Sequence, residues 1–376
     1  MKTIGIDYTP AYEQGGGIGR YVRELVTALL ALDEDAVHYK LFVAGAKQHD
    51  PRLLPNAKVT WKTTRLSPKW LARLWQRAQI PIPIETFIGR TDIFHATDFV
   101  LPPNHTRTIL TVHDLSFVRV PEAASPRLRA FLDKVVPRSV QRADHILADS
   151  IATKQDLVNL YHTLPEKITV LYSGVETRFQ RIANVAHLDR VRAKYHLSST
   201  PFIFSVGTVQ PRKNYSRLIQ AVARLRNAGM DIDLVIAGGR GWLENPIYQA
   251  VADNKLTQHV HFIGFVDDDD LPALYSLAHL TALPSLYEGF GIPVLESMAC
   301  GTPVLTSNIS SLPEVAGDAA LTITPTNLDE LCENLTRLVT DDTLRKLLIE
   351  RGYEQAKQFT WTAAAQQLQL IYRRFL

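Results

Sequence analysis

The chain has 376 residues, which is too long for one ordinary core and predicts about two domains. Apolar residues make up 46% and charged residues 21%, with 41 Lys and Arg against 38 Asp and Glu. This balance excludes a disordered, collagen-like or coiled-coil protein. Two cysteines cannot form a disulfide framework, so we expect a reducing, cytoplasmic compartment. The N-terminus does not read as a signal peptide, and no apolar run of about 18 residues predicts a membrane span.

The charge is unevenly placed along the chain. Residues 1–186 hold 24 Lys and Arg against 18 Asp and Glu, whereas residues 187–376 hold 17 against 20. A basic first half predicts an anionic partner for that half, without saying which one.

Short apolar runs alternate with helical patterns from end to end. Most runs are continuously apolar, which is typical of parallel strands buried on both faces. In the first half they are Thr3–Asp7, Lys40–Ala44, Asp92–His95, Thr108–His113, His145–Ala148 and Ile168–Tyr172. In the second half they are Phe202–Val206, Asp233–Ala237, His261–Ile263, Leu280–Leu283, Pro303–Thr306 and Ala320–Ile323. Each half is therefore predicted to be an α/β domain with a doubly wound parallel sheet.

A polar stretch over residues 176–200 marks the boundary, so we predict domains over 1–180 and 181–360. Two Rossmann-like domains joined there would face a cleft between the carboxyl ends of their strands. Open α/β sheets bind ligands at that edge.

The first motif is GGGIGRY at residues 15–21, between a predicted strand and a helix. Glycines let the backbone approach a phosphate or sugar, and a helix N-terminus offers free N–H groups. A plain strand-to-helix turn is the alternative. The second is His113-Asp114, at the carboxyl end of the run TILTVHD, where a polar pair would point into the cleft. A histidine held by a core hydrogen bond is its alternative.

The third motif is GTVQPRKN at residues 207–214, directly after a buried strand. Arg212 and Lys213 suit a diphosphate, because a guanidinium forks onto oxygens and an ammonium adds a point charge. A solvated basic turn is the alternative interpretation.

The fourth motif, SLYEGFGIPVLESMACGTPV at residues 285–304, is the most informative. Glu288 precedes a Gly-Phe-Gly loop, and Pro293 suits the first turn of a helix that carries Glu296. A helix N-terminus favours a phosphate, while carboxylates accept hydrogen bonds from hydroxyls. The combination predicts a site for a polyol attached to a phosphate.

The run Asp267–Asp270 could suggest a metal site. It lies between a predicted strand and a helix, where aspartates cap and stabilise a helix N-terminus. We therefore predict a cap, with no metal.

Residues 51–84 contain no Asp or Glu but seven Lys and Arg. Trp70 and Trp75 recur there at helical spacing, beside Lys69, Arg73 and Arg77. Such a helix could lie on an anionic membrane, with its tryptophans at headgroup level. The alternative, slightly favoured, is that both tryptophans pack into the domain. No nucleic-acid motif accompanies the charge.

These motifs together resemble the retaining glycosyltransferases of group 1, also called family 4. The similarity rests on PRKN, Gly238-Gly239, FIGFV and two glutamates eight residues apart followed by ACGTPV. It is dense over residues 203–318 and weaker in the first half. It implies the GT-B fold, with the terminal helix at 361–376 packing back on the first domain.

The resemblance also implies the roles of single residues. Arg212 and Lys213 would bind the donor diphosphate, Glu288 the sugar hydroxyls, and Glu296 the ribose. His113 would contact the donor sugar from the other domain. The full nucleotide-sugar set implied is Gly16, Gly17, Gly207, Thr208, Arg212, Lys213, Phe265, Val266, Glu288, Gly289, Phe290, Gly291 and Glu296.

The implied reaction is sugar transfer with retention and without a metal or other cofactor. The opening residues and SVGTVQPRKN look most similar to a bacterial mannosyltransferase-like branch, which favours GDP-mannose over UDP- and dTDP-sugars. A glycan or lipid-pyrophosphate acceptor is expected, with peripheral contact at the inner membrane face and no nucleic-acid partner. The alternatives are an epimerase or phosphorylase on the same fold, or a non-catalytic nucleotide-sugar binder.

Overall fold

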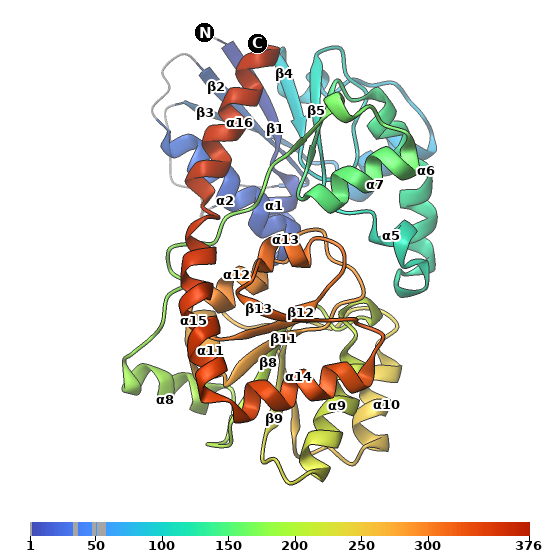
Figure 1. Ribbon diagram of the computed structural model, residues 1–376. Helices are drawn as coiled ribbons and strands as arrows, with labels where there is room; N and C mark the ends of the chain where they lie inside the picture. Colours follow the sequence, from blue (N-terminus) through green and yellow to red (C-terminus); the bar gives the residue numbers. More distant parts are fainter. Residues whose placement is uncertain (1, 33–36, 47–49, 51–57) are drawn as a thin grey trace. The chain divides into compact units, whose positions relative to one another are not determined.

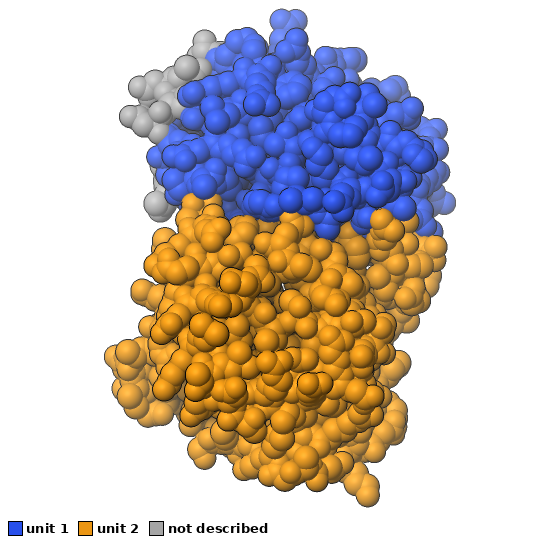
Figure 2. Space-filling view, viewed as in Figure 1, with its two compact units in different colours: residues 1–115, 130–174, 361–376 blue, residues 116–129, 175–360 orange. Residues whose placement is uncertain are grey.

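The computed structural model describes residues 2–32, 37–46, 50 and 58–376, and the chain divides into two compact units (Figures 1 and 2). Unit 1 comprises residues 1–115, 130–174 and 361–376, and unit 2 comprises residues 116–129 and 175–360. The sequence-based division placed 116–129 in the first domain and the boundary at 180. In the structure residues 116–129 belong to unit 2, and the boundary falls after residue 174.

Unit 1 is built on a seven-stranded parallel sheet with the order β3-β2-β1-β4-β5-β6-β7. Its strands are β1 (Lys2–Asp7), β2 (Val37–Ala44), β3 (Val59–Thr64), β4 (Ile93–Ala96), β5 (Arg107–Val112), β6 (His145–Ala148) and β7 (Ile168–Val170). Its helical segments are α1 (Thr9–Glu13), α2 (Gly17–Ala31), α3 (Pro68–Ala72), η1 (Arg73–Arg77), α4 (Glu85–Ile88), α6 (Pro126–Arg142, whose first turn belongs to unit 2), α7 (Ile151–Tyr161), η3 (Pro165–Lys167) and α16 (Trp361–Phe375). The order of the strands reverses between β1 and β4, which makes this the point where such sheets bind ligands.

Unit 2 repeats the plan with six parallel strands in the order β10-β9-β8-β11-β12-β13. The strands are β8 (Phe202–Val206), β9 (Asp233–Ala237), β10 (Val260–Gly264), β11 (Leu280–Leu283), β12 (Val304–Ser307) and β13 (Ala320–Ile323). The helical segments are α5 (Ser116–Arg119), η2 (Pro121–Ala123), α8 (Val185–Lys194), η4 (Pro211–Lys213), α9 (Tyr215–Asn227), α10 (Asn245–Asp253), α11 (Leu271–Leu277), α12 (Ile292–Ala299), α13 (Leu312–Ala316), α14 (Leu328–Thr340) and α15 (Asp342–Lys357). Here the strand order reverses between β8 and β11.

The continuously apolar strands are explained by helices on both faces of the sheet. In unit 2, Ile203 and Leu234 belong to a core cluster formed with α9, α10 and α14. Their neighbours in the chain, Phe204 and Val235, belong to a second cluster formed with α8 and α11. Because successive side chains of a strand point to opposite faces, both faces must be apolar. The predicted pair of doubly wound parallel sheets is confirmed.

The sequence analysis missed strand β3, which pairs with β2 at the edge of unit 1. Its residues are half-buried or exposed and read V-T-W-K-T-T, so they lack the continuous apolar run of an inner strand. An edge strand is not enclosed on both faces, and its pattern is correspondingly weak.

The C-terminal helix α16 packs against α2 within unit 1. The hydroxyl of Tyr372 lies 2.7 Å from Nδ1 of the buried His95, and the rings of Trp361 and Tyr21 meet edge to face at 5.9 Å. Unit 1 therefore completes its core with the last residues of the chain.

Candidate active site

The predicted diphosphate residues lie beside the point where the strand order of unit 2 reverses. The turn that carries Arg212 and Lys213 follows β8, and the loop that carries Glu288 follows β11. Because β8 and β11 are neighbours and parallel, their carboxyl ends bring these side chains together. The loops are also joined by the backbone, since the amide of Leu286 donates to the carbonyl of Arg212 at 2.8 Å.

Glu288 binds both cations directly. Its Oε2 accepts a hydrogen bond of 2.6 Å from Nη1 of Arg212, and its Oε1 accepts one of 2.6 Å from Nζ of Lys213. Arg212 also donates to the carbonyl of Tyr287 at 2.6 Å, and the hydroxyl of Ser285 donates to Glu288 at 2.7 Å. The carboxylate therefore fixes the two basic side chains in one geometry.

This cluster carries a net positive charge in a largely buried place. Glu288 is 7% exposed, and burial alone would raise the pKa of its carboxyl. Arg212 and Lys213 outweigh that effect and lower the pKa to about 2, so the carboxylate is ionised at neutral pH. One negative charge between two cations leaves an excess of one positive charge. Such a group suits an anion, because charge-assisted hydrogen bonds strengthen away from water.

Glycine at position 207 makes room for this arrangement. A Cβ atom there would lie 2.7 Å from Cε of Lys213, and the backbone has a φ of +148°. The Lys213 side chain therefore passes over Gly207 on its way to Glu288. A side chain at position 207 would clash with it there. The hydroxyl of Tyr215 holds the carbonyl of Gly207 at 3.0 Å.

Serines that the sequence analysis did not single out hold the Glu288 loop. Ser310 accepts from the amide of Glu288 at 3.0 Å. Ser311 donates to the carbonyls of Glu288 and Phe290, at 2.9 and 2.8 Å. They follow β12 by a few residues, so only the pairing of β12 with β11 brings them to this loop.

The other predicted nucleotide-sugar residues of unit 2 differ in accessibility. Phe265, just after β10, is 63% exposed, whereas Val266 is buried. Glu296, on α12, is fully buried and accepts a hydrogen bond from the hydroxyl of Tyr275 at 2.8 Å. Thr208 is exposed, Gly289 is half-buried, and Phe290 and Gly291 are buried just before α12, whose N-cap is Gly291.

In unit 1, Gly16 and Gly17 are exposed at the start of α2, with Gly16 as its N-cap. A Cβ atom at either position would meet nothing within 4 Å. The space beside this helix N-terminus is open, as an anion would require.

His113 follows β5 and is buried in unit 1. Its Nδ1 lies 2.8 Å from Oδ2 of Asp149, and its Nε2 lies 2.9 Å from the carbonyl oxygen of Thr97. Asp149 was not singled out from the sequence, although it follows the buried run HILA as His113 follows TILTV. That position was the available signal.

The run Asp267–Asp270 caps α11 by its position only. Asp270 is the N-cap residue, as predicted, but its side chain makes no capping hydrogen bond. Lys194 pairs with Asp267 and Asp270, and Arg178 lies near Asp268 and Asp269. Ion pairing with neighbouring segments takes these carboxylates away from the helix N–H groups.

The two tryptophans of the basic segment lie in different environments, one packed and one exposed. Trp75 donates its Nε1 hydrogen to the carbonyl of Ile82 at 2.8 Å and meets Phe87 edge to face at 5.9 Å, so it packs within unit 1. Trp70 is 60% exposed, with the guanidinium of Arg73 over its ring at 4.9 Å. The described part of the segment, residues 58–84, also exposes Leu66 and Ile80, while residues 51–57 lie outside the described residues.

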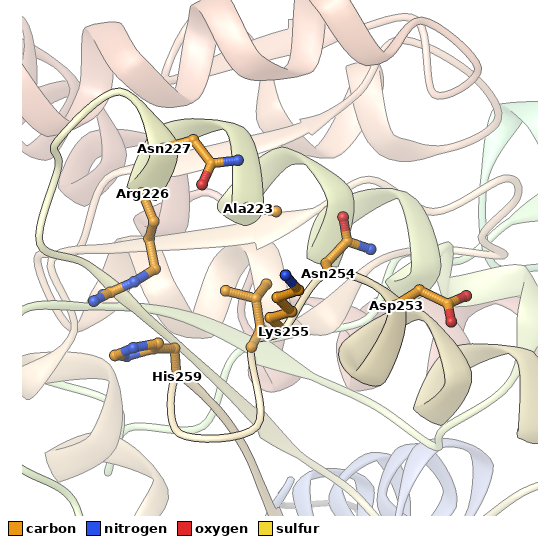
Figure 3. Close-up of a pocket in the computed structure, with 8 residues that line it drawn as sticks. Ala223, Arg226, Asn227, Asp253, Asn254, Lys255 and His259 are labelled. Carbon is orange, nitrogen blue, oxygen red and sulfur yellow. The ribbon is translucent and has the colours of Figure 1, made fainter.

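A surface pocket of about 530 Å³ lies elsewhere in unit 2 (Figure 3). It is lined by the end of α9, the end of α10 and the residues before β10, among them Arg226, Lys255 and His259. These residues precede β9 and β10, so the pocket lies at the amino ends of the strands. It is therefore separate from the Glu288 cluster at the carboxyl ends.

Comparisons with known proteins agree with the geometry. The family model described as glycosyl transferases group 1 matches residues 189–355, and that described as glycosyltransferase family 4 matches residues 15–179. The O-antigen chain mannosyltransferase B of Escherichia coli is 34% identical over 270 residues, which cover 72% of this chain and 71% of that protein. The chain belongs to the group 1 glycosyltransferases.

One further relative supports the family assignment, and one solved structure supports the fold. The O-antigen chain mannosyltransferase RfbU of Salmonella typhimurium is 30% identical over 329 residues. These residues cover 83% of this chain and 84% of that protein. The structure of sucrose-phosphate synthase from Thermosynechococcus elongatus superposes with a TM-score of 0.77 at 21% identity, covering 100% of this chain and 99% of that one. This glycosyltransferase accordingly has the predicted GT-B fold.

Replacing Arg212 or Lys213 by Ala tests the cluster. Each change removes a cation that would neutralise the departing diphosphate, so we expect turnover to fall about 10²-fold or more. Steady-state kcat measures this. Arg224→Ala, which removes an exposed ion pair with Asp329, is the control and should leave kcat unchanged. Normal kcat in both cluster variants would contradict a role in catalysis.

Proposed function

We propose that this glycosyltransferase transfers mannose from GDP-mannose, with retention of anomeric configuration, to a glycan or lipid-linked acceptor in polysaccharide synthesis. The observation that carries the proposal is the buried cluster of Arg212, Glu288 and Lys213, with its excess positive charge. The two mannosyltransferases that resemble most of the chain support mannose as the transferred sugar.

In the proposed reaction the cluster stabilises the leaving group. The bond between the anomeric carbon and the diphosphate oxygen breaks, and negative charge develops on that oxygen. A bond forms between the anomeric carbon and an acceptor hydroxyl, whose proton passes to the departing phosphate. Arg212 and Lys213 bind the diphosphate oxygen and its neighbours, while Glu288 keeps both cations in place beforehand. Groups that are already oriented need no reorganisation during the reaction, which is the main source of electrostatic catalysis.

Within unit 2 the family resemblance adds two further donor contacts: backbone near Phe265 and Val266 would meet the base, and Glu296 would bind the ribose. In unit 1 the same resemblance assigns His113 to the sugar. Glu288 is held by two cations and a serine hydroxyl, which makes it a poor nucleophile. This supports a mechanism in which the diphosphate departs from, and the acceptor attacks, the same face of the sugar, without a covalent intermediate between the sugar and the enzyme.

The donor is tested by thermal shift and transfer assays. A nucleotide present at about 100 times its Kd stabilises the folded state by about 2.7 kcal/mol, which raises Tm by several degrees. We expect GDP and GDP-mannose to give this shift, and UDP, ADP and dTDP to give less. Transfer of labelled mannose, with the anomer read by NMR, then tests retention. Stabilisation by UDP-sugars alone would overturn the donor, and an inverted product would overturn the mechanism.

We propose that transfer needs no metal ion. The proposal rests on the aspartates Asp267–Asp270, which pair with Lys194 and Arg178, and the described residues contain no metal-binding group of three or more His, Cys, Asp and Glu. The diphosphate charge would then be met by Arg212, Lys213 and helix N-termini.

Activity should therefore survive EDTA. Asp267→Asn and Asp269→Asn should stay active and change the free energy of unfolding by at most about 1 kcal/mol, the scale of exposed ion pairs. Loss of activity in EDTA that Mg²⁺ or Mn²⁺ restores would contradict metal independence. If both Asp→Asn variants were inactive as well, the metal would bind at these aspartates.

We propose further that the acceptor is reached at the cytoplasmic face of an anionic membrane. Trp70, Leu66 and Ile80 are exposed along a segment whose charges are all basic. No helix within the described residues is long and apolar enough to cross a bilayer, so the contact would be peripheral. Exposed tryptophan at headgroup level and basic side chains near anionic lipid both favour such binding.

Trp70→Ala should weaken binding to anionic vesicles, and salt should weaken binding of the unaltered protein. Leu164→Ala is a matched control, because Leu164 is 62% exposed elsewhere in unit 1 and should not affect binding. Co-sedimentation with anionic and neutral vesicles measures both. Equal binding to the two kinds of vesicle, or an unaffected Trp70 variant, would contradict the proposal.

A further inference from the structure

We propose that Asp149 is a positioning residue for His113, which it keeps doubly protonated and in one orientation. The inference rests on the proposed function, in which His113 contacts the donor sugar. It changes how His113 would act, because an imidazolium whose two N–H groups are engaged offers a fixed positive charge and no free ring nitrogen.

The pairing of two parallel strands places the two side chains together. Val112, the last residue of β5, is in register with Ala148, the last residue of β6. His113 and Asp149 are the next residues of each strand, so they emerge side by side at the carboxyl edge of the sheet. Both are 6% exposed.

The hydrogen bonds of the ring determine its protons. The Thr97 carbonyl oxygen, 2.9 Å from Nε2, can only accept, so Nε2 carries a hydrogen. Nδ1 faces a carboxylate oxygen of Asp149 at 2.8 Å, which is best satisfied when Nδ1 also carries a hydrogen. Burial alone would lower the pKa of His113. The charges of Asp149 and Asp98 and the two hydrogen bonds outweigh burial and raise this pKa to about 9.

The surrounding side chains leave the ring little freedom. Tyr21, on α2, and Phe99 meet it edge to face, at 5.0 and 5.4 Å between ring centres. The hydroxyl of Thr153, in the first turn of α7, donates to the carbonyl of His113 at 3.2 Å. Ser150, the N-cap of α7, binds Thr153 in turn and follows Asp149 directly in the chain.

Other titratable groups near the pair do not replace Asp149. Burial and the charge of His113 lower the pKa of His95 to about 3, so it is neutral. Burial raises the pKa of the Asp98 carboxyl, and no hydrogen bond joins it to the ring. The remaining groups in the neighbourhood are Asp7 at the end of β1, Tyr21 on α2 and Asp114 beside His113. Asp149 is thus the carboxylate that the His113 ring binds.

One oxygen of Asp149 is left over. Its Oδ1 is buried and has no hydrogen-bond partner among the described residues. A buried polar atom in that state is uncommon and calls for an explanation, of which a catalytic role is one. This agrees with a residue kept for its charge on His113 rather than for stability.

The charge state is tested without substrate by ¹⁵N NMR of histidine-labelled protein, with His113→Gln used to assign the signal. We expect both ring nitrogens of His113 to be protonated at pH 7.5 and to titrate near pH 9. In Asp149→Asn the pKa should fall by about 1 unit or more, because the shape is kept while the charge is lost. A neutral His113 in the unaltered protein, or an unchanged titration in the variant, would overturn the proposal.

The positioning role is tested by kinetics with whichever donor stabilises the protein. In Asp149→Asn we expect kcat to fall about 10²-fold, and the loss of activity at high pH to move to lower pH. Asp144→Asn is the matched control, because Asp144 lies just before β6 and binds Thr108 at 2.7 Å without contacting His113. It should leave both the His113 signal and the pH profile unchanged. A normal kcat and pH profile in Asp149→Asn would overturn the positioning role.

The two experiments separate the possible failures. If GDP-mannose is not a donor but the NMR results hold, the proposed donor fails and the charge assignment stands. If Asp149→Asn does not fold, the titration of His113 in the unaltered protein still decides the charge state. Phe99→Leu, which loosens the packing of the ring but keeps its hydrogen-bond partners, then decides the orientation through its kcat, and a normal kcat there would overturn the positioning role.

Discussion

In each unit all strands run in the same direction, so every carboxyl end lies at one edge of the sheet. Both ionic clusters depend on this alignment. Neighbouring strands β8 and β11 deliver Lys213 and Glu288 to the same place, and β5 and β6 deliver His113 and Asp149. Each strand pair joins residues that are far apart in the chain. The alignment itself is maintained by apolar side chains on both faces of the sheet, which is why the strands are continuously apolar.

Burial gives these clusters their electrostatic character. A buried charge is costly unless it is paired, and both clusters consist of ion pairs. They differ in net charge. Glu288 is shared by two cations and leaves a positive excess suited to a diphosphate, whereas His113 and Asp149 balance each other. The first arrangement fits binding an anionic leaving group, and the second fits holding one side chain in a fixed state.

Each unit contains segments that are distant from one another in the chain. Residues 116–129 follow His113 closely in the chain but belong to unit 2, where Nε1 of Trp242 donates to the carbonyl of Ala123 at 2.8 Å. The C-terminal helix α16 follows unit 2 in the chain but belongs to unit 1. There it packs against α2, whose Tyr21 touches His113. The surroundings of His113 in unit 1 are therefore supported by a helix remote from it in sequence.

The sequence by itself determined the class of fold and predicted a site that includes Arg212, Lys213 and Glu288. Continuous apolar strands and local motifs such as PRKN and Glu288-Gly-Phe-Gly are short-range signals that survive without the tertiary structure. It could not show that Glu288 binds Arg212 and Lys213, that Asp149 binds His113, or that Trp75 is packed while Trp70 is exposed. It also could not show that the side chain of Asp270, the N-cap residue of α11, pairs with Lys194 instead of making a capping hydrogen bond. Those facts depend on which strands become neighbours and which face of a short helix meets the core, and long-range packing decides both.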